Sequence, residues 1–351
     1  MAERQLGIGV IGCGGIAHAA HLPNIARNPR AKLIAVADID LDRAKATTDQ
    51  YGGVAYQDYH ELLANPDVEA VCITSWAAAH AEQVIAAAQA GKHILCEKPI
   101  AITLKDADAM VEAAEQAGVK FTMGYQPRFG TQWPLVKQLI DDGLLGQIMG
   151  ATVIAASPSS HGVPWFLDKS LSGGGVLIDW GIYTAYTLNW WLGPVSRVYA
   201  TSAIFRKDVT VRGQLLKDID VEDTVAAQLS FASGAMGTWY SAWAVKASHG
   251  GVTIDGTEGS IVIESGKHTV RLLSKKIDEP AQIAGWHEIP ANDPPLVEMH
   301  YRKIAHLVDS VLDDTPLVLT GADGRDALEL VLGIYRSADT GQPVDFPVAR
   351  G

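Results

Sequence analysis

The stretch QLGIGVIGCGGIA, residues 5–17, decides the fold of the first part of the chain. An apolar run typical of a buried strand leads into a glycine-rich turn, and a helical pattern follows. The turn is a G-x-G-x-x-A fingerprint, and Asp38 stands 21 residues after Ala17, at the end of the next apolar run. In a dinucleotide-binding βαβ unit, such glycines let the backbone approach a pyrophosphate and such an acid binds ribose hydroxyls. The alternative is an ordinary glycine-rich turn.

This fingerprint gives a set of residues an expected place at a cofactor: Gly12, Gly14, Gly15, Ile16 and Ala17. Asp38 would bond the ribose and repel a 2′-phosphate, and Asp40 and Asp42 add negative charge nearby. We therefore expect NAD, with NADP less favoured. Arg43 argues mildly for NADP, because a basic side chain at this position could bind a phosphate. The simpler interpretation is that Arg43 is a solvated residue of the following helix.

The pattern of apolar runs divides the chain after residue 123. Residues 1–123 alternate short apolar runs with helical patterns, which predicts a doubly wound, mostly parallel α/β sheet: a Rossmann domain. Strands are expected over 5–11, 33–37, 70–73, 93–96 and 119–123. Residues 124–351 hold strand-like runs with few helical intervals, at 147–155, 195–203, 222–231, 235–245, 252–254 and 260–264. They predict an α+β domain with an open, largely antiparallel sheet for substrate binding and oligomerisation. Two helices are expected near the end of the chain, over 296–312 and 322–337.

The composition limits the partners. The chain has 351 residues, 48% of them hydrophobic, and a net charge of −12, which argues against nucleic acid and anionic membranes. No apolar run is long enough to span a bilayer, and the N-terminus lacks a signal-peptide pattern. The three cysteines are odd in number and lie in apolar contexts, which favours reduced thiols and a cytoplasmic protein.

A second stretch, LSGGGVLIDWGIYTAYTLNWWLG over 171–193, is expected to carry chemistry. Its three glycines indicate close backbone approach or unusual dihedrals. On the helix that follows, Asp179, Tyr183 and Tyr186 fall at i, i+4 and i+7 and share one face. A carboxylate beside a phenol could handle a proton. The alternative is a cap followed by core tyrosines.

Glu97-Lys98-Pro99 follows a strand, at the edge where open α/β sheets bind ligands. Lys98 could equally be a solvated surface residue, and the bond before Pro99 could be cis. A phenol with a pKa near 10 is a poor base at neutral pH, and a nearby ammonium would lower that pKa. Lys98 and Tyr183 therefore form a candidate acid–base pair.

Several stretches resemble the Gfo/Idh/MocA oxidoreductases: GVIGCGGIAHAAHLPNI (9–25), VADID (36–40), CEKPIAIT (96–103), SGGGVLIDWGIYTAY (172–186) and DALELVLGIYRSADTGQPV (326–344). The resemblance covers nearly the whole chain in order. It implies NAD(P)-dependent oxidation or reduction of sugars and cyclitols, with an open C-terminal sheet that often forms dimers or tetramers. The lysine of the family falls on Lys98 and its aspartate on Asp179.

Two positions depart from the family pattern. Tyr183 stands where the family commonly has histidine, as in its inositol dehydrogenases, which favours an aldopyranose without excluding a cyclitol. Ser75-Trp76 replaces the usual Thr-Pro, and both residues are expected on the cofactor side. His80 is either a cofactor-side residue or a polar group at a helix N-terminus.

Trp165, in the loop 161–168, could stack on a pyranose, and Arg128 follows the last strand of the first domain toward the same expected cleft. Asp168 or Lys169 could bond hydroxyls, and His300 and Tyr301 are weaker candidates. For each residue, loop anchoring or core packing is the alternative. No metal site is expected, because the histidines and cysteines lack ligand spacing.

These observations predict an NAD-dependent sugar dehydrogenase, with a small sugar or cyclitol as substrate and Tyr183 and Lys98 as the proton relay. Glu97 is expected beside the cofactor and Lys98 at both cofactor and substrate. The alternatives are an inositol dehydrogenase and a non-catalytic dinucleotide-binding regulatory protein. We expect a homodimer or homotetramer through the C-terminal sheet.

Overall fold

The structure is a computed structural model that describes residues 4–159, 163–277 and 285–348. The chain forms two compact units. The first comprises Met1–Phe129 and Pro294–Arg325, and the second comprises Gly130–Asp293 and Asp326–Gly351. The division expected after residue 123 is therefore incomplete, because the late segment Pro294–Arg325 belongs to the first unit.

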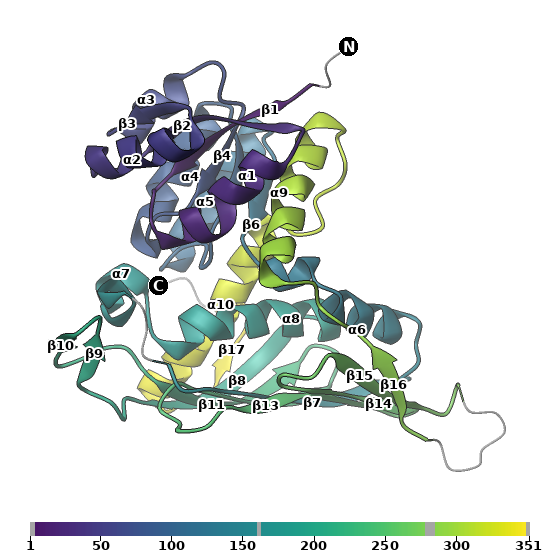
Figure 1. Cartoon of the computed structure of the whole chain (residues 1–351). Coiled ribbons are helices and arrows are strands. Elements are labelled where there is room, and N and C mark those ends of the chain that lie inside the picture. Colours follow the sequence, from purple (N-terminus) through teal and green to yellow (C-terminus); the bar gives the residue numbers. More distant parts are fainter. Residues whose placement is uncertain (1–3, 160–162, 278–284, 349–351) are drawn as a thin grey trace. The chain divides into compact units, whose positions relative to one another are not determined.

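Within the described residues, the first unit holds a six-stranded sheet in the order β3-β2-β1-β4-β5-β6 (Figure 1). All neighbouring strands are parallel, as expected for a Rossmann domain. The strands are β1 (Leu6–Ile11), β2 (Ala31–Ala37), β3 (Val54–Tyr56), β4 (Ala70–Ile73), β5 (His93–Cys96) and β6 (Phe121–Met123). The order reverses between β1 and β4, and sheets of this topology bind ligands outside the carboxyl ends of such strands.

Helices cover this parallel sheet. They are α1 (Leu22–Arg27), α2 (Leu41–Tyr51), α3 (Tyr59–Ala64), α4 (His80–Gln89), α5 (Leu104–Ala117) and α9 (Leu296–Leu312), with the short turns η1 (Ala17–His21), η2 (Ala77–Ala79) and η3 (Gln126–Phe129). Thr103 caps α5 by accepting a hydrogen bond from the Asp106 amide, and Gly118 ends it with a φ of 66°. Both features match the residue types that favour helix ends.

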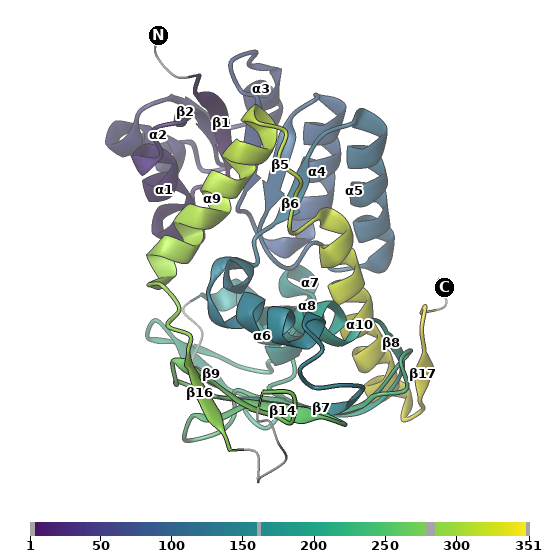
Figure 2. The same cartoon turned by 90° about the vertical axis from the view of Figure 1, so that its right-hand side faces the viewer.

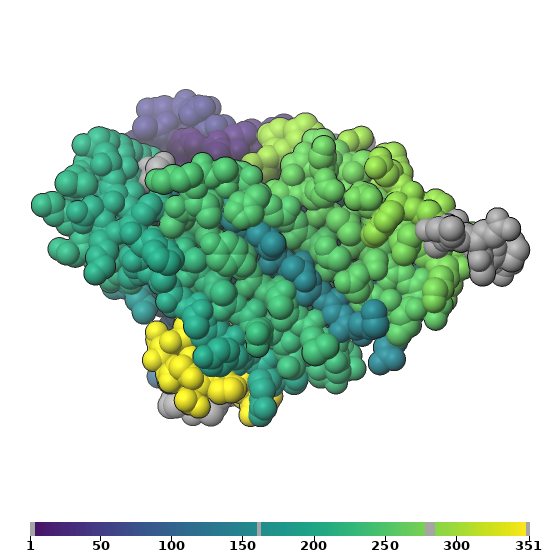
Figure 3. All heavy atoms as spheres, turned by 90° about the horizontal axis from the view of Figure 1, so that it is seen from below, coloured from purple at the N-terminus to yellow at the C-terminus, as the bar shows by residue number. Residues whose placement is uncertain are grey.

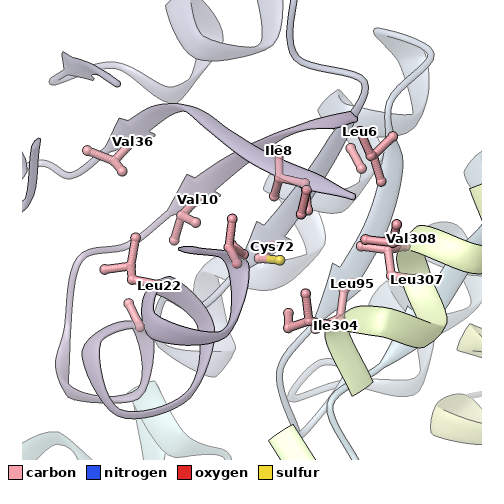
Figure 4. Close-up of a cluster of buried hydrophobic side chains, with 14 of the residues drawn as sticks. Leu6, Ile8, Val10, Leu22, Val36, Cys72, Leu95, Ile304, Leu307 and Val308 are labelled. Atoms are coloured by element: carbon pink, nitrogen blue, oxygen red, sulfur yellow. The ribbon is translucent and has the colours of Figure 1, made fainter. Parts of the chain in front are cut away.

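Helix α9 belongs to the core of the first unit, where it packs against β1, α1 and η1 (Figure 2). Ile304, Leu307 and Val308 follow the i, i+3, i+4 spacing of an apolar helix face and are fully buried. They join a cluster that includes Leu6 and Leu22 (Figure 4). Hydrophobic burial therefore holds a late segment of the chain against its first strand.

The second unit is built on a mixed sheet, in the order β16-β15-β14-β13-β7-β12-β11-β8-β17. Its pairs are antiparallel except for β7 and β12, which are parallel, so the expectation of a largely antiparallel sheet is confirmed. The strands are β7 (Ile148–Ala156), β8 (Val195–Ala203), β11 (Thr224–Phe231), β12 (Met236–Ala242), β13 (His249–Gly256), β14 (Gly259–Glu264), β15 (Thr269–Ser274), β16 (His287–Pro290) and β17 (Val344–Asp345). A separate ribbon pairs β9 (Val209–Val211) with β10 (Gln214–Leu216).

One face of the mixed sheet is covered and the other is open. The helical segments of this unit are α6 (Gln132–Asp141), η4 (Pro164–Leu167), α7 (Lys169–Ser172), η5 (Leu177–Gly181), α8 (Ile182–Leu192) and most of α10 (Gly321–Thr340). Residues of β11 alternate between buried and exposed, which is the pattern of a sheet packed on one side. Figure 3 shows the open face, where β7 runs as a blue strip between green strands.

In the described part of the chain, no helix is both long and apolar enough to cross a membrane. The expected strands and late helices are confirmed to within a few residues at their ends. Strands β3, β15, β16 and β17 and the β9–β10 ribbon were not among the expected elements.

Candidate active site

The carboxyl edge of the parallel sheet gathers the residues expected at a cofactor. The turn after β1 carries Gly12–Ala17, and Asp38 follows β2. Ser75 and Trp76 follow β4, and Glu97 and Lys98 follow β5. Because all these strands are parallel, their carboxyl ends lie at one edge of the sheet. The expectation that these residues share one edge is confirmed.

The glycine-rich turn has the geometry of a dinucleotide-binding loop. Gly12 has a φ of 94°, and a Cβ there would lie 2.9 Å from the backbone nitrogen of Ser75. This glycine therefore permits the close passage of the β1 and β4 turns. Gly14 and Gly15 have no positive φ and no protein atom within 4 Å of an added Cβ. Their lack of a side chain leaves space beside the backbone, as a bound pyrophosphate requires.

Asp38 is anchored beside this turn. Its carboxylate is buried and accepts hydrogen bonds from the backbone amides of Cys13, at 2.8 Å, and Asp40, at 2.9 Å. Arg43 forms ion pairs with Asp38 and Asp40, each at 3.2 Å. The guanidinium of Arg43 is thus paired with two carboxylates. This pairing weakens the argument that Arg43 binds the 2′-phosphate of NADP.

His80 links two of the turns at the sheet edge. The imidazole is buried, with Nδ1 2.8 Å from the Pro99 carbonyl and Nε2 3.2 Å from the Ser75 carbonyl. Burial lowers the pKa of His80, which keeps the ring neutral. Trp76 is partly exposed, and the Ser75 hydroxyl donates to Gln83 at 2.6 Å. A neutral imidazole has one N–H, so His80 donates to one of these two carbonyls, and the shorter distance favours Pro99.

The Lys98–Pro99 peptide bond is cis, one of the two forms that the sequence leaves open. Glu97, just before it, is buried and forms an ion pair with Lys303 at 2.6 Å and a hydrogen bond with His21 at 2.7 Å. Burial alone would raise the pKa of Glu97, but the charge of Lys303 and the two hydrogen bonds hold it well below its usual range. Glu97 is therefore an ionised carboxylate beneath the strand-end turn.

The second stretch of interest lies wholly in the second unit. Gly173 ends α7 with a φ of 84°. A Cβ on Gly174 would lie 2.2 Å from the Tyr335 hydroxyl, and one on Gly175 would lie 1.8 Å from the Glu222 carbonyl oxygen. The prediction of close approach and unusual dihedrals is confirmed, and the neighbours are residues of this unit.

Glu222 holds this glycine loop. Its buried carboxylate accepts hydrogen bonds from the backbone amides of Gly175, at 2.8 Å, and Leu177, at 3.0 Å, and from the Tyr335 hydroxyl, at 2.8 Å. Burial raises the pKa of Glu222, and the three donors oppose that rise. The carboxylate thereby fixes the loop that leads directly to Asp179.

Asp179 lies in a π-helical turn, η5, and Tyr183 lies in the α-helix that follows, α8. The expected uniform helix is therefore interrupted by one wider turn at its start. Asp179 and Tyr186 are buried, and Tyr183 is partly exposed. Tyr186 stacks on Trp190 with ring centroids 5.9 Å apart, which fits the alternative of core packing for that residue.

The expected substrate residues have contacts of their own. Arg128 Nε donates to the Val318 carbonyl at 3.2 Å, and Trp165 stacks on Phe166 with centroids 4.0 Å apart. Asp168 caps α7 by accepting from the Ser170 amide at 2.9 Å, which fits the anchoring alternative. The rest of that loop, residues 161–162, lies outside the described residues.

His300 and Tyr301 lie on α9 in the first unit. His300 is buried, and burial together with the charge of Lys303 lowers its pKa to about 4. The ring of Tyr301 packs under Arg27, whose guanidinium carbon lies 4.0 Å from the ring centroid. Both residues take part in the packing of α9. Among the residues that the structure describes, no group of three or more metal-binding side chains occurs.

Glu222, Tyr335, His21 and Lys303 were missed from the sequence. Glu222 is the first residue of an expected strand, 222–231, and Lys303 lies within an expected helix, 296–312, so neither position is unusual locally. A lysine on the apolar side of a helix is a weak signal of a buried partner, and only the fold identifies that partner.

Comparison with known proteins agrees with this geometry. Residues 6–125 match the family described as "Oxidoreductase family, NAD-binding Rossmann fold", and residues 133–262 match the "GFO/IDH/MocA C-terminal domain". The chain is 30% identical to myo-inositol 2-dehydrogenase of Thermotoga maritima, over 95% of this chain and 96% of that protein. It is 29% identical to 1,5-anhydro-D-fructose reductase of Ensifer adhaerens, over 96% of this chain and 98% of that one.

A solved structure is also similar. The crystal structure of an aldose-aldose oxidoreductase from Caulobacter crescentus, complexed with glycerol, superposes with a TM-score of 0.83 and 27% identity. The match covers 98% of this chain and all of the other. The similarity therefore extends over both units of the chain.

Two glycine substitutions separate the role of the turn in folding from its role in binding. Gly14→Ala adds a methyl that meets no protein atom, so we expect unchanged thermal stability but NAD binding weaker by roughly tenfold or more, about 1.4 kcal/mol. Gly12→Ala places a side chain at positive φ against Ser75, so we expect a loss of about 1–3 kcal/mol of unfolding free energy. Calorimetry of NAD binding and of unfolding measures both. A Gly14→Ala protein that binds NAD as tightly as the wild type would contradict the assignment.

The buried His21 makes stability depend on pH. Burial and the charge of Lys303 lower its folded pKa to about 4, so the unfolded chain binds a proton that the folded chain does not as pH falls from 6.5 toward 4. His21→Gln keeps a donor for Glu97 and removes this titration. Between pH 7 and pH 4, we expect the variant to lose about 3 kcal/mol less unfolding free energy than the wild type. Denaturant unfolding at each pH tests this, and parallel stability profiles for the two proteins would refute it.

Proposed function

The chain belongs to the GFO/IDH/MocA family of NAD-binding oxidoreductases, and on this basis we propose that it transfers a hydride between NAD and a hydroxyl-bearing carbon of a monosaccharide. The names of the similar proteins above refer to an anhydro sugar, a cyclitol and aldoses. The observation that carries the proposal is Lys98, the second residue after β5, at the same sheet edge as the glycine-rich turn. A cyclitol is the alternative substrate.

The cofactor is held by the edge of the parallel sheet. We assign its pyrophosphate to the turn Gly12–Ala17 and its ribose to Asp38, with Ser75, Trp76, His80 and Glu97 lining the remaining edge. When bound, the nicotinamide gives or takes the hydride. The anchored Asp38 and the ion-paired Arg43 favour NAD over NADP, because a carboxylate repels a 2′-phosphate.

The residues of this chain handle the proton that accompanies the hydride. In the oxidation, Tyr183 takes the proton of the substrate hydroxyl, and in the reduction it returns that proton. A phenolate is scarce at neutral pH, and an ammonium stabilises it. We assign that ammonium to Lys98 and the orientation of the hydroxyl to Asp179. Arg128 and Trp165 are assigned to the remaining sugar surface, through hydrogen bonds and stacking.

The open face of the mixed sheet supports a proposal on assembly. Exposed apolar side chains lie on the open face of its strands, with Met236 69%, Tyr199 43% and Ile154 37% exposed. Apolar patches of this kind mark interfaces, and we propose a homodimer or homotetramer through this face. A monomeric mass in light scattering at micromolar concentration would contradict it. The buried, free cysteines fit a reducing compartment, and we propose a cytoplasmic location.

The reaction is tested with a panel of monosaccharides, cyclitols and their lactones, followed by NADH absorbance with NAD and with NADP. We expect turnover of at least one aldopyranose and a preference for NAD. NAD binding without turnover of any compound would favour a regulatory protein, and a clear preference for NADP would overturn the role of Asp38.

The proton relay is tested by a matched pair of substitutions on α8. Tyr183→Phe should lower kcat about 10²–10⁴-fold, because a general base is lost, with little change in NAD affinity. Tyr186→Phe makes the same chemical change at a core position and should retain turnover. Near-normal turnover of Tyr183→Phe would remove Tyr183 from the mechanism.

A further inference from the structure

Three ionisable side chains meet in the interior of the first unit, directly beneath the turn that carries Lys98. Lys303 and His21 are 0% exposed and Glu97 is 5% exposed. The Lys303 Nζ lies 2.6 Å from Glu97 Oε1, and the His21 Nε2 lies 2.7 Å from the same oxygen. One carboxylate oxygen thus receives two donors from separate elements, α9 and η1.

The charges of this cluster follow from its hydrogen bonds. His21 Nε2 lies 2.7 Å from an ionised carboxylate oxygen, which can only accept a hydrogen bond, so Nε2 carries the hydrogen. Nε2 of a neutral His21 therefore donates to Glu97, alongside Lys303. The pKa of His21 is lowered to about 4 by burial and by the charge of Lys303, which agrees with a neutral ring. Glu97 and Lys303 form the buried ion pair, and His21 adds a neutral hydrogen bond.

Glu97 connects this ion pair to Lys98. Its second oxygen, Oε2, lies 3.4 Å from the backbone nitrogen of Lys98. The carboxylate also fills the space beside Gly124, where a Cβ would lie 2.7 Å from it. On the far side of the turn, the Pro99 carbonyl meets His80 at 2.8 Å. The backbone of Lys98 is therefore held from both sides by side chains of the first unit.

Burying an ion pair costs the desolvation free energy of both charges, and apolar residues of similar volume often stabilise a folded protein as well or better. The position of this ion pair, directly beneath the turn that carries Lys98, points to a role besides folding. We propose that Lys303 is a positioning residue for the reaction: its ammonium fixes the Glu97 carboxylate, and thereby the backbone from which Lys98 projects. This inference rests on the proposed role of Lys98 in proton handling.

The test compares Lys303→Met with the double variant Lys303→Met/Glu97→Gln. The single variant leaves a buried carboxylate without its cation and is expected to be less stable. The double variant removes both charges and restores folding. Arg30→Met is the control, because Arg30 also ties α9 to the rest of the unit, through Asp309 at 2.9 Å and Asp313 at 2.6 Å, away from Lys98.

Three quantities are measured on each folded protein: NAD affinity, kcat with the best sugar of the panel, and the rate at which an amine-reactive acetylating reagent modifies Lys98, followed by mass spectrometry. Lys98 is partly exposed, so it is open to the reagent. For the double variant, at an NAD concentration that its measured affinity shows to be saturating, we expect kcat lowered about 10²-fold by misplacement of Lys98 and a changed rate of Lys98 acetylation. Arg30→Met should match the wild type in all three.

The outcomes separate the inference from the proposed function. A double variant that folds and regains wild-type kcat and acetylation would make the ion pair purely structural and overturn the inference. A wild type without turnover of any sugar, in which Lys98 acetylation still depends on Lys303, would overturn the proposed function and leave the positioning role standing. An inactive wild type whose acetylation is independent of Lys303 would overturn both.

Discussion

A carboxylate that is buried away from water must find hydrogen-bond donors or a cation, and two loops of this chain, the turn Glu97–Pro99 and the glycine loop Gly173–Gly175, depend on that constraint. In the first unit, Glu97 finds Lys303 and His21, and its second oxygen lies near the Lys98 amide. In the second unit, Glu222 finds Tyr335 and the amides of the glycine loop. Each carboxylate therefore ties the backbone of a loop to distant elements of its own unit.

The same constraint explains the glycines of the second stretch. Gly174 and Gly175 leave room for Tyr335 and for the backbone of Glu222, so a side chain at either position would push the loop away from its support. Gly14 and Gly15 differ, because no protein atom occupies the space beside them. Glycines that serve internal packing and glycines that leave space for a ligand can thus be distinguished by what an added methyl would meet.

Much of the fold could be predicted from the sequence. The runs 70–73, 93–96 and 195–203 form strands with those bounds, and the helix 296–312 begins and ends where expected. Local apolar patterns and caps determine such elements. The fingerprint and the residues at the strand ends also predict which edge of the sheet carries the cofactor site, because the carboxyl ends of parallel strands lie at one edge.

The supporting residues could not be predicted, since they are joined by tertiary contacts. Lys303 lies 206 residues from Glu97, and Tyr335 lies 113 residues from Glu222. Neither the return of α9 to the first unit nor the π-helical turn at Asp179 leaves a signal in residue spacing. Lys98, Asp179 and Tyr183, by contrast, stand in local motifs that are visible in the sequence.

The central claim, that this chain moves a hydride between a nicotinamide and a sugar carbon, is tested most directly by isotope transfer. The purified protein is incubated with NADH in which both hydrogens at C4 of the nicotinamide are replaced by deuterium, together with keto sugars and lactones, and the products are analysed by mass spectrometry. We expect one deuterium on the reduced carbon of a sugar product. Bound NADH with no deuterium in any sugar would contradict it.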